Sequence, residues 1–185
     1  MSRWKVFCLM FLIVRAVATS QNLVPAVVES NLIFVSEDKA GHAVKYSVGN
    51  AYMLLSLSNG DFTLNADLSA ISTGNKRQDS LVSSYGSQML SFKGNIGENL
   101  MVFNRQENDE KSYPMSGVLT VNTNSVSGVA QFDPINLAEK GETKNYRMDF
   151  LLSIDPSKIV IKGMENMFAK QIVLEIVAGK LNVQQ

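Results

Sequence analysis

His42 is the one histidine of this 185-residue chain, and it has the side chain best suited to acid–base chemistry near neutral pH. It lies beside Gly41 in a predicted turn, after Glu37 and Asp38, either of which could orient an imidazole. A catalytic imidazole also needs a nucleophile within hydrogen-bond reach. The sequence identifies no such group near His42, so we interpret it as a solvated turn residue.

Two further polar groups have residue types found in metal sites or in nucleophilic catalysis. Residues 107–110 (Glu-Asn-Asp-Glu) carry oxygen ligands that calcium accepts, but they lack the glycine-punctuated spacing of a dedicated loop. Serines at positions 80, 83, 84 and 87 could include a nucleophile, yet residues 85–89 lack the second glycine of a nucleophile elbow. We therefore expect no catalytic residue, no metal site and no cofactor.

Arg77 and Asp79 are the polar pair best suited to contact a ligand. A guanidinium at the mouth of a site could hold an anionic head group through two parallel hydrogen bonds. The alternative is a helix-surface pair of modest electrostatic value. Lys45 and Lys93 could make the same kind of contact with less geometric support. We favour the helix-surface interpretation and keep Arg77 as a candidate ligand-binding residue.

The first 18 residues are predicted to be a signal peptide. They combine a basic start, an apolar run at residues 6–14 and a small-x-small site at residues 16–18. The run is too short for a comfortable membrane span. Arg15 lies close to the cut, so an uncleaved anchor is the alternative. We predict an exported protein, periplasmic or secreted, with one domain over residues 19–185.

Removing this leader changes the charge and the cysteine content. Arg3, Lys5 and Arg15 are lost, so the 17 basic side chains fall to 14 against 17 acidic ones, a net charge of −3. This balance excludes the basic stripe that a nucleic-acid partner would require. Cys8 is the only cysteine, so the remaining chain has no disulfide and no thiol ligand. We expect no nucleic-acid partner and a fold stabilised by packing.

Alternation of apolar and polar residues is the dominant pattern along the chain. Phe62, Leu64, Ala66 and Leu68, for example, alternate with polar residues. Successive side chains of a strand point to opposite faces, so each such run predicts a half-buried strand. About ten strands are predicted, at residues 32–35, 44–48, 51–57, 62–68, 89–96, 100–104, 115–121, 125–132, 146–154 and 172–178.

Short turns between these runs favour an antiparallel order. Residues 58–61 (Ser-Asn-Gly-Asp) and 122–124 (Asn-Thr-Asn) are tight polar links of the hairpin type. Long antiparallel meanders with one apolar face best avoid exposed edges by closing. We therefore predict an all-β protein, an antiparallel closed barrel of lipocalin-like form, with a sandwich as the structural alternative.

A few segments depart from the strand pattern. Residues 75–85 predict a short helix that packs on the rim of the barrel. Residues 157–171 combine a strand-like run at 159–161 with one amphipathic turn that contains Met164, Met167 and Phe168. The charged stretches 106–112 and 138–145 predict solvated loops. The expected fold thus contains one or two short helices.

The apolar face of the predicted strands is the more promising site. A closed barrel would bring bulky side chains together inside, where they form either a filled core or the lining of a cavity for one small ligand. The sequence does not decide between the two. The predicted lining residues are Tyr46, Leu55, Phe62, Leu64, Phe92, Leu119, Phe132, Phe150 and Ile176.

Four segments in a fixed order resemble the YceI-like family of extracytoplasmic barrel proteins. They are residues 68–74 (LSAISTG), 77–81 (RQDSL), 91–94 (SFKG) and 117–121 (GVLTV), and the tail at 149–155 and 172–178 is also similar. The chain departs from the family pattern at Ser80, where histidine is frequent, and at Thr123-Asn124, which replaces a glycine turn. It also lacks the Asp-Arg-x-Asp-Phe-Gly pattern of the last third. The resemblance implies a lipocalin-like barrel that holds an isoprenoid-type lipid.

Two hypotheses of function follow. The first is a non-enzymatic carrier that binds a long apolar lipid in the barrel lumen, with the nine lining residues and Arg77 as ligand contacts. The second is an envelope interaction or stress-response module whose barrel is filled and whose outer face meets a protein through an apolar patch. Leu54, Leu151 and Val173 are the candidates for that patch. The sequence leaves the ligand and the oligomeric state open.

Overall fold

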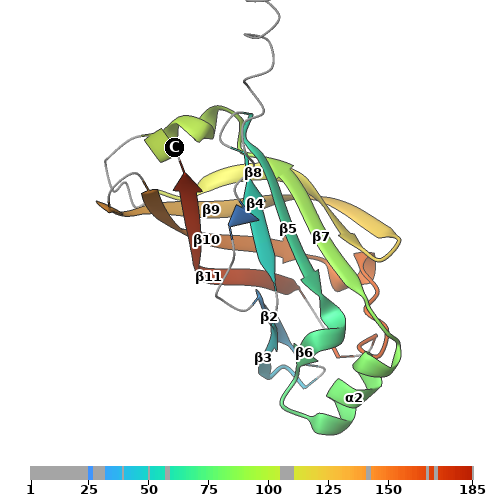
Figure 1. The fold of residues 1–185 in the computed structure, drawn as a ribbon. Helices are drawn as coiled ribbons and strands as arrows, with labels where there is room; N and C mark the ends of the chain where they lie inside the picture. Colours follow the sequence, from blue (N-terminus) through green and yellow to red (C-terminus); the bar gives the residue numbers. More distant parts are fainter. Residues whose placement is uncertain are drawn as a thin grey trace, which may run out of the picture.

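The fold is one antiparallel sheet that curls around an apolar interior (Figure 1). The structure is a computed structural model, and residues outside its described ranges are not discussed. Those ranges are 25–26, 32–38, 40–49, 51–56, 59–104, 111–140, 143–165, 167–168 and 171–184.

Eleven strands in these ranges form the sheet, in the order β1-β4-β5-β7-β8-β9-β10-β11-β2-β3-β6. The strands are β1 (Pro25–Ala26), β2 (Leu32–Glu37), β3 (Ala43–Val48), β4 (Tyr52–Leu55), β5 (Asp61–Asp67), β6 (Ile71–Ser72), β7 (Met89–Asn95), β8 (Tyr113–Val121), β9 (Asn124–Lys140), β10 (Thr143–Ile154) and β11 (Ile172–Gln184). The helical elements are η1 (Leu68–Ala70), α2 (Lys76–Ser84), η2 (Gly97–Asn104) and η3 (Pro156–Lys158). The predicted all-β class is confirmed.

Both predicted hairpin turns are present. Gly60 has φ 77° in the β4–β5 turn, where its N–H donates to the Ser56 carbonyl at 2.8 Å. Asn122 has φ 54° between β8 and β9, a left-handed conformation that asparagine tolerates better than most residues. The strands on either side of each turn pair in an antiparallel register. Local turn chemistry therefore sets the register of both hairpins.

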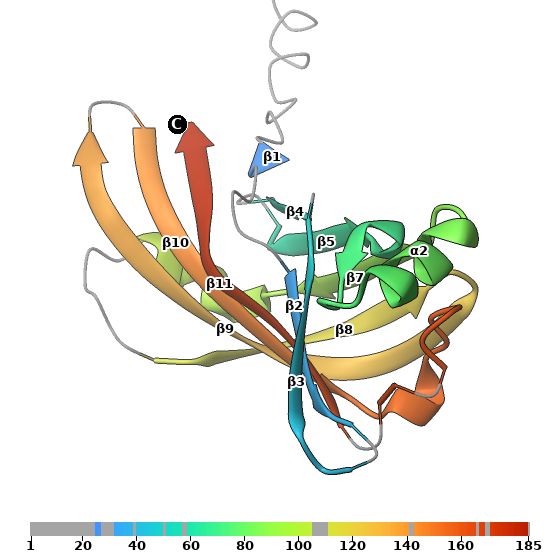
Figure 2. The ribbon, with the colours of Figure 1, turned by 90° about the horizontal axis from the view of Figure 1, so that it is seen from below.

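The sheet is open, which corrects the predicted closed barrel. Its two edges are the two-residue strands β1 and β6, and within the described residues no pairing joins them. β5, which lies two strands in from the β1 edge, runs through the single turn η1 into β6, the other edge, which pairs with β3. Strands of two residues are too short to make a continuous ladder, so the sheet forms a curled trough (Figure 2).

The predicted helix over residues 75–85 is α2, Lys76–Ser84. The Asn75 side chain accepts hydrogen bonds from the N–H groups of Arg77 and Gln78, at 3.1 and 3.3 Å, and thereby caps the first turn. Val82 is the one residue of this helix that is buried. Its contact with the body holds α2 at the lower end of the trough (Figure 1).

Two predicted strands are not strands. Residues 100–104 belong to the 3-10 helix η2, which follows Gly97 at φ 54°; a short apolar run alone does not distinguish helix from strand. Residues 159–161 form no strand either, and Ile159 and Ile161 pack into the apolar cluster. The predicted amphipathic turn agrees with the structure: the Met164 N–H donates to the Ile161 carbonyl at 2.9 Å, the Met167 N–H donates to the Met164 carbonyl at 3.0 Å, and Met164, Met167 and Phe168 pack in or against the apolar cluster.

The predicted loop at 138–145 is also wrong. Strand β9 continues to Lys140 and β10 begins at Thr143, and these two residues pair in register. Backbone hydrogen bonds between strands do not depend on side-chain polarity. The charged residues therefore extend the β9–β10 hairpin, although their composition alone predicts a solvated loop. Residues 106–110, most of the other predicted loop, lie outside the described residues.

None of the helices in the described part of the chain has the length and apolar character needed to cross a bilayer.

Candidate functional site

The inner face of the curled sheet gathers all nine predicted lining residues into one apolar cluster. They come from eight strands, β3, β4, β5, β7, β8, β9, β10 and β11. Each is buried: Tyr46, Leu55, Phe62, Leu64, Phe92, Leu119, Phe132, Phe150 and Ile176. The alternation in the sequence thus predicted correctly which side of each strand faces inward. Their contact with a ligand stays a prediction.

Three phenylalanine rings meet across the lumen. The centroids of Phe62 and Phe150 lie 5.6 Å apart in a stacked pair, and Phe92 meets Phe150 edge-on at 5.3 Å. β5 and β10 are separated in the sheet by β7, β8 and β9, so this contact exists only because the sheet curls. Aromatic pairs of this geometry stabilise beyond their buried area. At this level the lumen is filled by the protein's own side chains.

A row of glycines makes room for the Phe92 ring. Gly94 pairs with Gly117, and Gly117 pairs with Gly128, across three neighbouring strands. A Cβ atom at Gly117 would collide with the Phe92 ring and would lie 2.5 Å from the Lys93 carbonyl oxygen. The backbone therefore approaches closely here, which only glycine permits. Gly94 and Gly117 belong to the segments that resemble the YceI-like family, but their packing role is visible only in the structure.

One end of the lumen is closed by the segment that joins β10 to β11. We call its described residues, 155–165 and 167–168, the cap. Ile159, Ile161 and Met164 are buried in the apolar cluster. The Phe168 ring packs on Phe34 and Tyr46, with centroids 6.4 and 6.0 Å apart. The cap therefore plugs the lower end of the trough with apolar side chains.

Burial also affects the one hydroxyl of the lining. Tyr46 lies under the cap with 8% of its surface exposed. Burial, with a smaller contribution from the charge of Asp38, raises the pKa of this phenol. Tyr46 is thus neutral at physiological pH and serves as a bulky lining residue with one polar atom.

Two glutamine side chains hold the cap in place. The Gln88 amide pairs with the backbone of Lys162 in both directions: its Nε2 donates to the carbonyl at 3.1 Å, and its Oε1 accepts from the N–H at 2.8 Å. Gln88 is only 2% exposed. The Gln78 amide donates to the carbonyl of Gly163. Sequence reasoning missed both residues, because their partners lie 74 and 85 positions away.

Arg77 lies apart from the nine lining residues. It is exposed on α2, outside the apolar cluster, and lines a surface hollow of about 370 Å³ with Asn75, Gln78, Ser80 and Leu81. Asp79 accepts hydrogen bonds from the Thr73 N–H at 2.8 Å and its hydroxyl at 2.6 Å. Residues two apart on a helix do not face each other, and within the described residues no ion pair joins Arg77 to Asp79. The predicted pair is therefore not formed.

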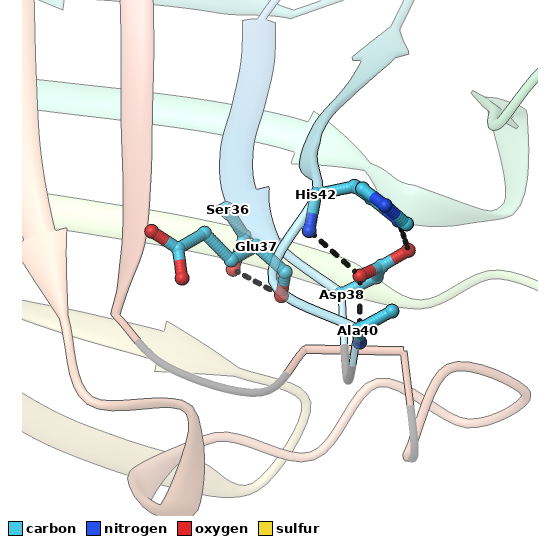
Figure 3. Close-up of polar contacts among 5 residues, drawn as sticks. All are labelled: Ser36, Glu37, Asp38, Ala40 and His42. Carbon is cyan, nitrogen blue, oxygen red and sulfur yellow. Dashed lines mark hydrogen bonds and ion pairs between the residues drawn. The ribbon is translucent and has the colours of Figure 1, made fainter.

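His42 is held by its own turn (Figure 3). Asp38 accepts hydrogen bonds from the N–H groups of His42 and Ala40, at 2.9 and 2.8 Å, and lies 3.3 Å from the His42 ring nitrogen. The His42 side chain is 77% exposed. The hydrogen bond from the His42 N–H is the main cause that lowers the pKa of Asp38. These contacts support the interpretation of His42 as a solvated turn residue.

The hydroxyl of Ser36, on the strand that leads into this turn, is used in hydrogen bonds to the backbone. Ser36 is 6% exposed, and its Oγ donates to the Gln171 carbonyl at 3.0 Å and contacts the Glu37 carbonyl at 3.4 Å. Of the serines singled out from the sequence, Ser84 donates to the Leu81 carbonyl and Ser87 to the Asp67 carboxylate. The hydroxyls of these serines are thus used in local structural hydrogen bonds.

A metal site has little support in this part of the chain. Within the described ranges no group of three or more His, Cys, Asp or Glu side chains converges. The acidic run at 107–110 lies outside those ranges, so the calcium interpretation is not tested.

Comparison with solved structures identifies the fold. A polyisoprenoid-binding domain from Saccharophagus degradans superposes with a TM-score of 0.69 at 15% sequence identity, covering 89% of this chain and 100% of that domain. BcnA from Burkholderia cenocepacia gives a TM-score of 0.54 at 14% identity, covering 84% and 97%. The YceI protein of Campylobacter jejuni gives 0.52 at 13% identity, covering 92% and 96%.

Comparison at the level of sequence finds no match. No family model matches the chain, and no curated protein matches it. Identities of 13–15% are informative about architecture alone. The superposition on nearly whole neighbouring domains agrees with the resemblance found in the sequence, and we conclude that this chain has the YceI-like fold.

Proposed function

We propose that this protein binds a long apolar lipid of isoprenoid type in its lumen and carries it without chemical change. The observation that carries the proposal is the inner face of the sheet. The nine predicted lining residues come from eight strands, and all of them are buried aliphatic or aromatic residues. A neighbour of the same fold is described as a polyisoprenoid-binding domain, which supports the same class of ligand.

The energetics suit such a ligand. Removing apolar surface from water contributes about 25 cal/mol per Å², from which the costs of immobilising the ligand are subtracted. A flexible hydrocarbon chain offers a large apolar area and few polar groups. A lining without charged side chains, such as the nine residues above, would leave no charged group of the protein buried without a partner.

The ligand in this proposal lies beyond the phenylalanine cluster. The rings of Phe62, Phe92 and Phe150 fill one level of the lumen, and the cap closes the lower end. Strands β9, β10 and β11 continue well past this level toward the other end of the trough (Figure 2). The lipid would run along the inner face of these three strands, which pair with one another, with the aromatic cluster as the floor of its site.

Binding without catalysis is part of the proposal. His42 is engaged with Asp38 at the surface, and the hydroxyls of Ser36, Ser84 and Ser87 donate to neighbouring oxygens. A nucleophile, a base and an orienting group do not come together at any of these side chains. We further propose that residues 1–18 are a cleaved leader and that the domain works outside the cytoplasm, in the periplasm or after secretion.

A second candidate function is an interaction module with a filled lumen. The aromatic cluster favours it, since it already occupies part of the interior. Of the predicted outer-face residues, Leu151 is 42% exposed, while Leu54 and Val173 are partly covered. Val129, which is 54% exposed, lies diagonally across from Leu151, because Leu151 pairs with Gln131. This would be the start of an apolar contact surface.

A contact-range fluorescence experiment distinguishes the two functions. The only tryptophan, Trp4, lies in the predicted leader, so Phe132→Trp creates a single inward reporter in the mature chain. A brominated isoprenoid alcohol quenches tryptophan only near contact. We expect saturable quenching of the Phe132→Trp protein and much weaker quenching of Val129→Trp, its matched control on the outer face. Equal quenching of both, together with no lipid in organic extracts of protein from its native host, would support the filled module.

A further inference from the structure

One row of inner-face residues marks the place where the sheet becomes narrow. Phe132, Phe150 and Ile176 pair with one another across β9, β10 and β11. Within the described residues, β8 pairs with β9 only as far as Phe132, and β2 pairs with β11 only as far as Glu175. Past this row, β9, β10 and β11 continue as a three-stranded extension (residues 133–140, 143–149 and 177–184; Figure 2). The row is therefore the boundary between the body of the sheet and the extension.

The row is closely packed. Its three side chains are buried, each with 1% or less of its surface exposed. The Phe150 ring is held from across the lumen by Phe62 at 5.6 Å and by Phe92 at 5.3 Å. The Phe92 ring in turn fills the space that a Cβ atom at Gly117 would take. Each of these rings thus packs against another ring or against backbone, so the row resists displacement by a ligand.

The strands also change direction beside this row. The pairing of β10 with β11 shifts register between Met148 and Phe150, which indicates a β-bulge. A bulge bends its strand and is frequent next to functional sites. Figure 1 shows that β11 bends sharply between the body of the sheet and the extension. A straight hydrocarbon chain that follows the inner face of the extension would therefore meet the row where the strands turn.

We propose that Phe150 is the stop on which the hydrocarbon end of the ligand rests, and that it sets how many isoprene units the protein buries. The inference rests on the proposed function, in which the lipid runs along β9, β10 and β11. Phe150 lies on the middle one of these strands, between Phe132 and Ile176. All three side chains are hydrocarbons and offer no partner to a polar head group, so the hydrocarbon end of the lipid faces them.

A fixed stop makes binding depend on chain length. Units that lie along the extension are removed from water, whereas units that reach past its end stay exposed and disfavour a longer ligand. Removing the Phe150 ring would leave an apolar cavity at the stop. Apolar cavities stay dry and take up apolar molecules. A phenyl ring and an isoprene unit are similar in volume, so the variant should prefer a ligand longer by about one unit.

A competition between isoprenoid alcohols tests the stop. The full mature chain is incubated with phosphatidylcholine vesicles that contain equal amounts of alcohols from farnesol upward, in steps of one isoprene unit. The protein is then separated from the vesicles, and its bound alcohols are identified by mass spectrometry. We expect one length to be enriched on the wild-type protein. In Phe150→Ala, the ratio of the next longer alcohol to that length should rise on the order of tenfold.

A milder variant and a matched control complete the experiment. Phe150→Leu, which costs less stability, should raise the same ratio roughly threefold. Phe34→Leu is the control, because Phe34 is equally buried but lies nearer the closed end, where it pairs with Leu174 and packs on the Phe168 ring of the cap. It should leave the length distribution unchanged. Circular dichroism confirms that each variant is folded.

Two kinds of failure are distinguishable. Bound alcohols with the same length distribution in the wild type and both Phe150 variants would overturn the stop and leave lipid binding intact. An equal shift in Phe34→Leu and Phe150→Leu would also overturn it, since the shift would then reflect general loosening of the core. Recovery of no alcohol from any protein, the wild type included, would overturn the proposed function and the stop with it.

Discussion

The wall of the lumen and its cap are held by different forces. The wall depends on its backbone ladder and on burial, since Phe62, Phe92 and Phe150 interlock beside a row of glycines. The cap depends on directional hydrogen bonds as well as on burial, because the Gln88 amide makes two hydrogen bonds with the backbone of Lys162. Packing stabilises the fold in proportion to the apolar area that it buries, and this stabilisation is lost when the whole domain unfolds. A segment that is held by a few hydrogen bonds can open locally while the sheet stays intact.

This difference has a functional consequence. In the proposed carrier function, the wall would be the permanent part and the cap would be the part that opens. The cap has no ladder pairing within its described residues and is the long connection between two adjacent strands. Opening it would expose Tyr46 and Phe34 without breaking a strand pair.

The largest expected effect comes from the glycine row. Gly117→Val would place side-chain atoms against the Phe92 ring and the Lys93 carbonyl, which cannot both move away. We expect a loss of more than about 4 kcal/mol in the free energy of unfolding, measured by urea denaturation. Gly128→Ala is the control, since its Cβ would lie 3.2 Å from the flexible end of Leu152. A stable Gly117→Val protein would show that the wall is not closely packed there.

Truncating one ring of the cluster should cost slightly less. Phe150→Ala removes two ring contacts and leaves a cavity, for which we expect a loss of about 3–5 kcal/mol in unfolding free energy. Leu151→Ala, at the next position on the outer face, should change stability by about 0.5 kcal/mol or less. Similar losses in the two variants would contradict the assignment of inner and outer faces.

Removing the hydrogen bonds between Gln88 and Lys162 should destabilise the cap more than the wall. Gln88→Leu leaves the partly buried N–H and carbonyl of Lys162 without their side-chain partner, at a cost of about 1–3 kcal/mol. Hydrogen exchange should accelerate at Lys162 while the amides of β7 and β8 stay protected. Gln131→Leu, an exposed glutamine on β9, serves as control. Uniform acceleration across the sheet would mean that cap and wall open together.

The smallest effect concerns pH. Burial alone would raise the pKa of Asp67, but hydrogen bonds from Ser69, Ser87 and Gln88 outweigh it and lower the pKa below its ordinary 3.8. The stabilisation is therefore present above pH 3.8 and is lost as pH falls through the lowered value. Asp67→Asn should destabilise by less than about 1 kcal/mol at neutral pH, with a difference from wild type that shrinks on acidification. A difference independent of pH would contradict the ionised role of Asp67.

Much of the fold could be predicted from local patterns. The alternation at residues 62–68 and 115–121 identified strands and their buried faces, because period-two polarity is itself the signature of a half-buried sheet. The turn residues Gly60 and Asn122 marked where strands end, through their backbone chemistry. The lining residues followed from the same alternation, and all nine are buried together.

Other features had no local signal. The 3-10 helix at 97–104 and the cap residues 159–161 have the same apolar composition as strands, so only their tertiary neighbours decide their conformation. The place of Arg77 outside the lumen depends on how α2 docks through Val82. The strand extensions at 138–140 and 143–145 follow from pairing with each other.

Local residue order therefore accounts for the strands, the hairpin turns, the helix and the inward face, since each arises from interactions between residues close in the chain. Tertiary structure alone decided that the sheet stays open, that the lumen is filled at Phe62, Phe92 and Phe150, and that Gln88 fastens a cap 74 positions away. The physical reason is that these features are contacts between distant segments. Their geometry exists only after the sheet has curled.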